Sequence, residues 1–340
     1  MSGDITWREL NSQPSAWAAL LGRLQSGALA LPADPSDYDE TVLLGSGTSY
    51  YLALALADWM RRRGLNARAV PSCEVMLDPW ETRASGARRL AIGLSRSGRS
   101  SELLLAEKKL RAAGFDTLGV SCTEGSDLLR QSRHALPIAE GHEDGLVMLR
   151  SFTSMLIALQ WLTGDAGDRA ALAALPAAAR DCLRDHSDAV RRIAEARSFD
   201  RFVFLGSGPD YPLAQEAGLK VQEMSIATSE AYHSLDYRHG PKACADANTA
   251  VVLFALEDRA HGLALARDIK ALGAAVIVVG RDAAAYSGVA DLVVPGADGL
   301  SAGQAAALTL LPAQLFAFAT AIRRGRDPDA PVNLSRVVTF

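Results

Sequence analysis

Little in this sequence of 340 residues indicates a metal, a membrane or a nucleic acid. Its four cysteines are scattered without a C-x-x-C pair and its six histidines have no ligand spacing, so we expect no metal and a reducing, cytoplasmic environment. A net charge of −4 argues against nucleic acid or an anionic membrane as a partner. We find no apolar run of the roughly 18 residues that a membrane span needs, and residues 1–10 lack the pattern of a secretory signal.

Short apolar runs that alternate with helical periodicity predict an α/β fold. Alternation of this kind is typical of a parallel sheet with helices on both faces, a flavodoxin-like three-layer sandwich. In the first half of the chain, strands are expected at residues 41–44, 66–70, 89–94, 115–120 and 134–138.

The pattern returns in the second half of the chain, which predicts two tandem lobes. Residues 43–50 (LLGSGTSY) and residues 204–211 (FLGSGPDY) match as a strand followed by a glycine turn, and the later elements match in the same order. The expected division is a helical arm (residues 1–36), a first lobe (37–165), a helical connector (166–197) and a second lobe with a C-terminal tail (198–340).

The turn Ser95–Ser100, with the sequence SRSGRS, lies where an apolar strand passes into a helix. We call it the phosphate loop, because serine hydroxyls, a glycine and the free N–H groups at a helix start can wrap a tetrahedral anion. The alternative is a serine-rich helix cap with nothing bound. The corresponding turn of the second lobe, residues 257–262, has two acids and no serine. We therefore expect one phosphate site, in the first lobe.

Ionisable residues gather after the glycine turn of the second lobe. Glu216, Lys220 and Glu223 share one face of a predicted helix, for which a solvated salt-bridge face is the common explanation. The segment 229–241 that follows is too irregular for a core element, and His239 precedes Gly-Pro in a fixed turn where an imidazole can be aimed. A carboxylate and a histidine near a phosphate site can transfer protons on a phosphorylated sugar.

Six motifs, taken together and in order, resemble the double sugar isomerase (SIS) domain family. They are GSGTSY (45–50), LSRSGRSSE (94–102), RSFTSML (150–156), GSGPDYPLAQEAGLKVQEMS (206–225), SEAYHSLDYRHGP (229–241) and PVNLSRVVTF (331–340). The resemblance is to the isomerase half of glucosamine-fructose-6-phosphate aminotransferase and to the stand-alone amino-sugar and tagatose-6-phosphate ketose/aldose isomerase and deaminase branch. It implies two tandem SIS lobes and aldose–ketose isomerisation of a hexose 6-phosphate, with deamination as a further step where C2 carries nitrogen. No metal or organic cofactor is implied.

The resemblance also implies roles for individual residues. Glu223 would move the proton between the first two sugar carbons, and His239 would assist ring opening from the neighbouring subunit, which implies a homodimer with shared sites. The residues implied to hold the phosphate are Ser95, Ser97, Ser100 and Thr48. Further candidates around the substrate are Gly47, Ser49, Arg96, Glu143, Arg150, Glu216, Lys220 and Arg336.

Three arginines depart from the family pattern. Arg336 stands where the aminotransferase has a lysine that can form a Schiff base, and a guanidinium is no practical nucleophile. It could still bind the phosphate or polarise a carbonyl. Arg96 and Arg99 of the phosphate loop stand where other members have uncharged or acidic residues, which favours a different or more acidic ligand.

Two other classes of protein remain as alternatives. SIS lobes also occur in regulatory proteins that bind sugar phosphates without catalysis, but this chain has no basic patch for DNA. The pair Gly45-x-Gly47 suggests a nucleotide-binding oxidoreductase. However, Tyr50 takes the place of the third glycine and no acidic residue lies about 20 positions on.

Overall fold

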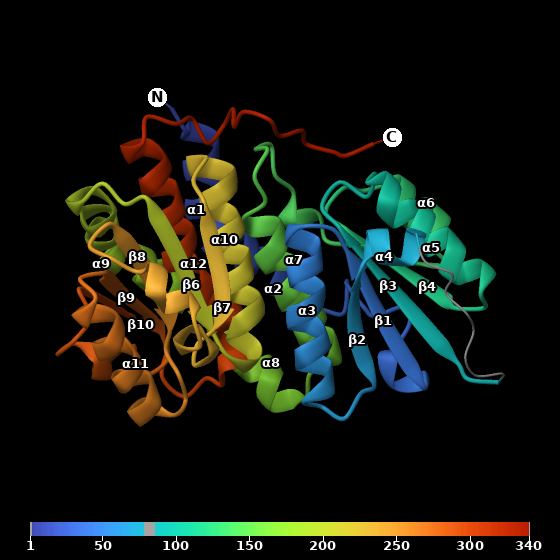
Figure 1. Ribbon diagram of the computed structural model, residues 1–340. Coiled ribbons are helices and arrows are strands. Elements are labelled where there is room, and N and C mark those ends of the chain that lie inside the picture. Colours follow the sequence, from blue (N-terminus) through green and yellow to red (C-terminus); the bar gives the residue numbers. More distant parts are fainter. Residues whose placement is uncertain (1, 78–85, 340) are drawn as a thin grey trace. The chain divides into compact units, whose positions relative to one another are not determined.

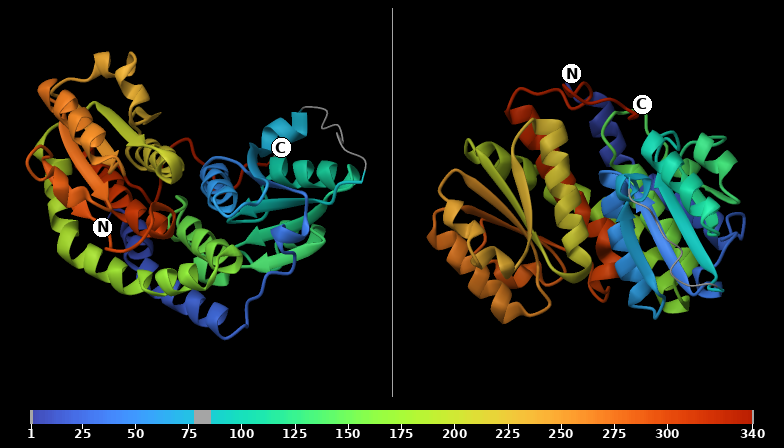
Figure 2. Two further views of the ribbon diagram at one scale, coloured as in Figure 1. Left: turned by 90° about the horizontal axis from the view of Figure 1, so that it is seen from below. Right: turned by 45° about the vertical axis from the view of Figure 1, so that its right-hand side comes forward.

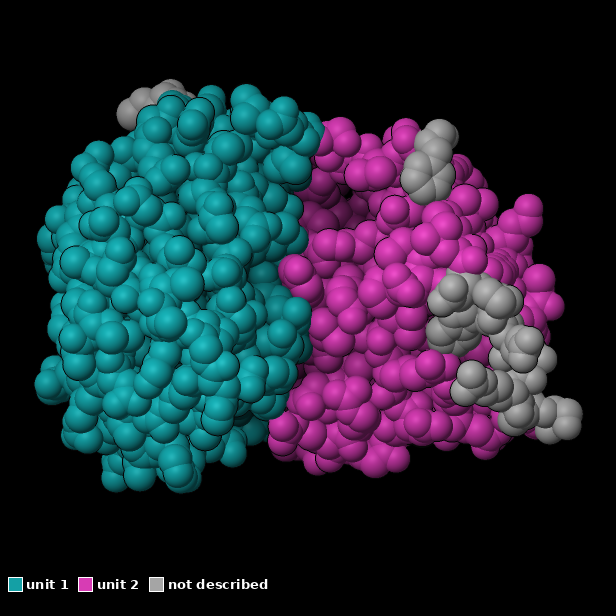
Figure 3. Space-filling view, viewed as in Figure 1, with its two compact units in different colours: residues 1–14, 145–147, 174–334 teal, residues 15–144, 148–173, 335–340 magenta. Residues whose placement is uncertain are grey.

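The computed structural model describes residues 2–77 and 86–339, and the chain divides into two compact units (Figures 1 and 3). Unit 1 consists of residues 1–14, 145–147 and 174–334, and unit 2 consists of residues 15–144, 148–173 and 335–340. This division differs from the lobes expected from the sequence. The N-terminal arm is shared between the units, and residues 335–340 belong to the unit that contains the phosphate loop.

Unit 2 contains a parallel five-stranded sheet in the order β2-β1-β3-β4-β5. Its strands are β1 (Glu40–Gly45), β2 (Ala67–Pro71), β3 (Arg89–Ser95), β4 (Asp116–Ser121) and β5 (His134–Pro137). Its helices are α2 (Gln13–Gln25), α3 (Thr48–Arg61), α4 (Ser72–Leu77), α5 (Ser101–Ala112), α6 (Asp127–Gln131), α7 (Arg150–Thr163) and α8 (Ala166–Ala173), with short 3₁₀ helices η1 (Pro35–Asp37) and η2 (Ala139–Gly141). The five strands predicted for this half of the chain are confirmed.

Both faces of this sheet are covered (Figure 2), and in β1, β3 and β4 every residue after the first is buried. On one face α3 packs against β1, β2 and α7. On the other face α4, α5 and α6 close a buried cluster of Val42, Leu44, Val75, Ala91, Leu103, Ala106, Leu110, Phe115 and Leu128. Burying a side chain of this kind contributes roughly 1.5–3 kcal/mol, so the sheet is a firm base for the turns at its carboxyl edge.

Unit 1 contains a second parallel five-stranded sheet, in the order β10-β9-β8-β6-β7. Its strands are β6 (Arg201–Gly206), β7 (Ser229–His233), β8 (Thr249–Phe254), β9 (Ala275–Gly280) and β10 (Leu292–Pro295). Its helices are α1 (Asp4–Asn11), α9 (Leu175–Ala196), α10 (Tyr211–Ser225), α11 (Arg259–Ala271) and α12 (Ala302–Arg323), with η3 (Gly208–Asp210), η4 (Asp236–Arg238), η5 (Pro241–Cys244) and η6 (Ala283–Tyr286). Read from β7 to β10, the strand order is that of unit 2, which confirms the predicted duplication.

The glycine that ends the first strand of each sheet shows the duplication in atomic detail. A Cβ on Gly45 would lie 2.3 Å from the backbone of Ser49, and a Cβ on Gly206 would lie 2.3 Å from the backbone of Asp210. Both strands therefore pass into the next helix so closely that only glycine fits.

Two expectations about unit 1 were wrong. Residues 229–233 are not irregular: they form β7, which lies at the edge of the sheet, where only one neighbouring strand is paired and polar side chains are tolerated. An apolar run of membrane-span length is also present, because α12 is 22 residues long with a mean hydropathy of 1.7 in its most apolar window. That window is 89% buried, between α9, α10 and the sheet, so α12 is the central core helix of unit 1.

Candidate functional site

In unit 2 two helices begin side by side at the carboxyl edge of the sheet. β1 pairs directly with β3, α3 begins at Thr48 just after β1, and α5 begins at Ser101 just after β3. The chain turns in opposite directions after these two strands, and ligands of such folds bind at this switch point. The hydroxyl of Ser46 donates to the Glu102 carboxylate over 3.0 Å, so the two turns are in direct contact. The positive ends of two helix dipoles thus face one place.

The phosphate loop is rigid because its neighbours hold its backbone. The carbonyl of Arg96 accepts hydrogen bonds from the hydroxyls of Ser121 and Thr123, both over 3.1 Å, and the Leu128 amide donates to the carbonyl of Gly98 over 2.9 Å. Gly98 has a φ of +61°, and a Cβ there would lie 2.2 Å from the Ser126 hydroxyl oxygen. The loop is therefore shaped before any ligand arrives, and Gly98 is required by both its dihedral angle and its surroundings.

The serines of the loop differ in how they are used. The Ser95 hydroxyl accepts from the Gly98 amide over 3.0 Å, and the Ser97 hydroxyl accepts from the Arg99 amide over 3.3 Å, so both shape the loop. Ser100 is the N-cap of α5, but its side chain makes no capping hydrogen bond. Thr48 and Ser49, in the first turn of α3, are buried, and Gly47 precedes them as the N-cap. The side chain of Ser100 therefore does not cap the start of α5, where the Ser101 amide donates to the backbone carbonyl of Val338 over 3.2 Å.

The corresponding helix of unit 1 starts differently. The carboxylate of Asp258 caps α11 by accepting from the His261 amide over 3.1 Å, and this bond lowers the pKa of Asp258. A fixed negative charge thus occupies the position where an anion would bind at the N-terminus of α11. This supports the expectation that the chain has one phosphate site.

Three candidate residues of unit 2 form a connected group behind the phosphate loop. The carboxylate of Glu143, which is fully buried, accepts from the Leu149 amide over 2.7 Å and from the Ser151 hydroxyl over 2.5 Å, and lies 3.8 Å from the guanidinium of Arg96. Arg336 donates to the backbone carbonyls of Asp144, over 2.7 Å, and of Glu143. Arg150 is half-buried, and its guanidinium donates to the carbonyl of His142 over 2.6 Å. Glu143 therefore serves the protein's own backbone rather than a ligand.

In unit 1 the charged face of α10 is buried, which excludes the alternative of a solvated salt-bridge face. The side chains of Glu216 and Lys220 are 0% exposed and that of Glu223 is 19% exposed. The Lys220 ammonium lies 3.3 Å from the Glu216 carboxylate and is hydrogen-bonded to Glu223. Burial alone would lower the pKa of Lys220, but the attraction of the two carboxylates outweighs it and the pKa is raised. Lys220 is a fixed cation that holds Glu223 at the protein surface.

Glu223 and His239 lie on opposite faces of the unit 1 sheet. Glu223 is in α10, and α10 packs on the same face of the sheet as α12. Phe202 of β6 marks this face, because its ring contacts Phe316 of α12 with ring centroids 6.1 Å apart. The turn that carries His239 is anchored on the other face, where Tyr237 packs into the α11 cluster and Arg238 forms an ion pair of 3.1 Å with Asp268 of α11. His239 itself is exposed. Within one chain, the sheet separates the two groups.

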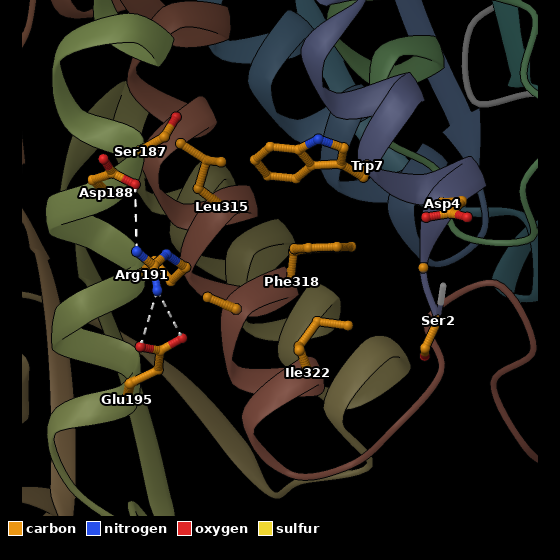
Figure 4. A pocket seen from close by; sticks show the side chains of 12 residues that line it. Ser2, Asp4, Trp7, Ser187, Asp188, Arg191, Glu195, Leu315, Phe318 and Ile322 are labelled. Carbon is orange, nitrogen blue, oxygen red and sulfur yellow. Dashed lines mark hydrogen bonds and ion pairs between the residues drawn. The ribbon is translucent and has the colours of Figure 1, made fainter.

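A cavity of about 500 Å³ in unit 1 contains none of the candidate residues (Figure 4). Trp7 and Phe318 form one part of its wall, with ring centroids 5.2 Å apart, and Arg191 is paired there with Asp188 and Glu195. With its apolar wall, and with Arg191, the cation among the described residues that line it, already paired with carboxylates, this cavity is unsuited to a sugar phosphate.

Sequence reasoning missed the residues that support the phosphate loop. Ser121 ends β4 and Thr123 and Ser126 follow it, so all three contact the loop from the neighbouring strand end. Ser46 follows β1 and contacts Glu102, just beyond the loop. Their position after predicted strands could have indicated this role, because the carboxyl ends of adjacent parallel strands meet at one edge of the sheet.

Comparison with known proteins agrees with this architecture. The SIS domain family matches residues 37–163 and 196–322. Glutamine–fructose-6-phosphate aminotransferase (isomerizing) of Pyrobaculum aerophilum is 29% identical over 98% of this chain and 57% of its own length, and that of Aquifex aeolicus is 28% identical over the same shares. The chain therefore spans little more than half the length of these relatives.

Solved structures match over the whole chain. Glucosamine-6-phosphate deaminase from Thermotoga maritima has a TM-score of 0.84 and 28% identity, and covers 99% of this chain and 100% of its own. Tagatose-6-phosphate ketose/aldose isomerase from Escherichia coli has a TM-score of 0.84 and 24% identity, and the match covers 98% of this chain and 97% of that chain. With two matched repeats, each built on one of the two parallel sheets, the chain belongs to the SIS domain family.

Proposed function

We propose that this chain binds a hexose 6-phosphate, an amino sugar, and isomerises it between aldose and ketose, with release of ammonia as the further step. The observation that carries the proposal is the pair of adjoining helix starts at the phosphate loop, one of them capped by a serine whose hydroxyl makes no capping bond. The names of the relatives, which act on glucosamine 6-phosphate, fructose 6-phosphate and tagatose 6-phosphate, support this class of substrate.

The phosphate provides binding energy away from the reacting carbons and fixes the open-chain sugar in place. Glu223 takes the proton from C2 while the C1 carbonyl oxygen gains one, giving an enolamine when C2 carries nitrogen. Return of the proton to C1 gives the 2-imine of the ketose. Water then adds to C2 and ammonia leaves, which completes the deamination without any oxidant or reductant. When C2 carries oxygen, the same proton transfer ends at the ketose.

Glu223 suits the role of base better than its two neighbours do. Glu216 is fully buried, and Lys220 is held as a cation by two carboxylates, which favours its protonated state. Glu223 is the member of the group that reaches the surface. The buried lysine then fixes the direction of the carboxylate, so the base is positioned before the substrate binds.

One observation favours the second candidate, a protein that binds sugar phosphates without catalysis. Arg336 stands where the aminotransferase pattern has its Schiff-base lysine, and its guanidinium is bonded to two backbone carbonyls. The proton-transfer route proposed above needs no imine bond between the sugar and a protein side chain. Arg336 is therefore compatible with catalysis of isomerisation and deamination.

We also propose that the protein is a homodimer in which His239 serves the neighbouring chain's site. The support is the position of His239 on the sheet face opposite to Glu223. An exposed imidazole in a turn is free to reach a second subunit.

The deciding experiment measures ammonia release, coupled to glutamate dehydrogenase, with glucosamine 6-phosphate and galactosamine 6-phosphate in separate assays. We expect release from one of the two. Glu223→Gln should lower kcat by about 10²-fold or more, because the base is lost while the phosphate contacts remain. The same variant should still be stabilised by the sugar phosphate in a thermal-shift assay.

The controls separate the two candidates. Ketose formation without ammonia would restrict the activity to isomerisation. If neither product forms although the sugar phosphates still raise the melting temperature, the binding protein is the correct interpretation. Unchanged turnover in Glu223→Gln would show that another group is the base.

A further inference from the structure

Three segments of unit 2 that lie far apart in the sequence meet at one side chain. Arg96 is the second residue of the phosphate loop, and its side chain is 8% exposed. One nitrogen of its guanidinium lies 3.8 Å from the buried carboxylate of Glu143, and another donates to the backbone carbonyl of Arg336 over 3.2 Å. Arg96 thus connects the phosphate loop, the segment before α7 and the C-terminal residues.

We call residues 335–339 the C-terminal segment. It is held on unit 2 at three points: the Arg336 guanidinium binds the carbonyls of Glu143 and Asp144, the Arg336 carbonyl accepts from Arg96, and the Val338 carbonyl accepts from the Ser101 amide over 3.2 Å. Ser101 is the first residue of α5, so the segment reaches the helix start that the phosphate loop precedes. Yet Arg336 and Val338 are exposed, and the segment has little buried surface to hold it.

We propose that Arg96 is a positioning residue, which keeps the C-terminal segment beside the phosphate loop so that the segment forms one wall of the ligand site. The role rests on the proposed function of that site. The chemistry of arginine explains the choice of residue: its planar group has five donors and a permanent charge, so it can serve the Glu143 carboxylate and the Arg336 carbonyl together. Glutamine would leave the buried carboxylate without a cation, and lysine lacks the fork.

The position of the segment should therefore respond to position 96. With Arg96 in place, its backbone is fixed by Ser121 and Thr123, and its side chain has a single well-defined partner on the segment. Without it, the described attachments of the segment are the contacts of the Arg336 guanidinium and of the Val338 carbonyl. A substrate would then bind only to the fraction of molecules in which the segment is in place, which raises KM and leaves kcat nearly unchanged.

The test is trypsin cleavage of the intact protein after Arg336, followed as loss of residues 337–340 by mass spectrometry. Arg96→Gln should raise the cleavage rate by about tenfold or more, because cleavage requires the segment to leave its site. Arg96→Lys keeps the charge beside Glu143, so its cleavage rate should lie between those of the wild type and Arg96→Gln. Arg99→Gln is the matched control: Arg99 lies in the same loop with its side chain exposed, and this variant should be cut at the wild-type rate.

The kinetic readout is a rise in KM for the sugar phosphate, with kcat preserved, that follows the order of the cleavage rates. Cleavage of Arg96→Gln at the wild-type rate would overturn the proposal, and so would equal acceleration in Arg99→Gln. If Arg96→Gln does not fold, Arg96→Gln/Glu143→Gln removes both charges while keeping an acceptor for the Leu149 amide, and the same outcomes apply. The cleavage assay needs no substrate, so it remains decisive even if the proposed catalytic activity fails.

Discussion

At the scale of the residue, Lys220 shows what the sequence could and could not give. Its spacing from Glu216 and Glu223 predicts one shared helix face, and the three side chains do contact one another. The spacing alone favours a solvated face, because charged residues are seldom fully buried. That α12 covers this side of the sheet and buries the lysine depends on residues about 90 positions later, which local periodicity cannot reveal.

Replacing Lys220 tests this buried group. In Lys220→Met the two carboxylates lose their cation, and we expect a loss of about 3–5 kcal/mol in the free energy of unfolding at neutral pH. The raised pKa of Lys220 means that its contribution is complete below the ordinary lysine value of about 10.4 and is lost as the pH rises through the folded-state pKa. Urea unfolding of both proteins should therefore show a difference that is constant at neutral pH and shrinks in alkali.

Two outcomes would count against this account of Lys220. A difference between the proteins that grows as the pH rises from neutral toward 10 would mean that the lysine is held neutral in the folded state. Should Lys220→Met not fold, Lys220→Met/Glu216→Gln leaves a single carboxylate. A double variant as stable to urea as the wild type would show that the lysine does not stabilise this group.

At the scale of the element, the phosphate loop was predictable and its support was not. The change from an apolar strand to a helical pattern locates the turn, and serine with glycine predicts an anion site. Its rigidity comes from residues after β4 and at the start of α6, which only the parallel register brings next to it. β7 was missed for the opposite reason: edge strands need little apolar surface, so Ser229–His233 has no strand-like pattern.

Two glycines distinguish backbone strain from side-chain contact: Gly98 lies in the phosphate loop and Gly114 lies just after α5. Gly98 and Gly114 both have positive φ angles, +61° and +85°, but a Cβ at Gly114 meets nothing within 4 Å. Gly114→Ala should lose only the conformational cost, about 1–2 kcal/mol. Gly98→Ala should lower the free energy of unfolding by at least the same amount, because its Cβ would also meet the Ser126 hydroxyl at 2.2 Å. It should also reduce the thermal stabilisation of the protein by glucosamine 6-phosphate.

A third variant supplies the control for this pair. Gly98→Ala/Ser126→Gly removes the clash and should recover part of both losses, as measured by urea unfolding and thermal shift. Equal behaviour of Gly98→Ala and Gly114→Ala would show that contact with Ser126 does not shape the loop.

At the scale of the whole molecule, the duplication was readable because both halves retain the strand and glycine turn, and the strand order confirms it. The sequence did not indicate which unit the terminal residues pack on. Residues 335–340 belong to the unit of the first sheet although they follow the second in the sequence, and the contacts that place them involve two arginines with no periodic pattern. The two sheets have the same strand order, but their helix starts differ: no side chain caps α5, whereas the Asp258 carboxylate caps α11.

The proposal of shared sites makes a prediction about mixtures of variants. If His239 completes the neighbouring chain's site, Glu223→Gln and His239→Asn dimers are each inactive, but a mixed dimer contains one site with both residues intact. Co-expression of the two in equal amounts should then restore about a quarter of the wild-type activity, since half of the dimers are mixed and each has one working site. Co-expression of Glu223→Gln with Glu223→Gln/His239→Asn should restore none. Activity no higher than that of the single variants would place His239 in its own chain's site, against the sheet that separates it from Glu223.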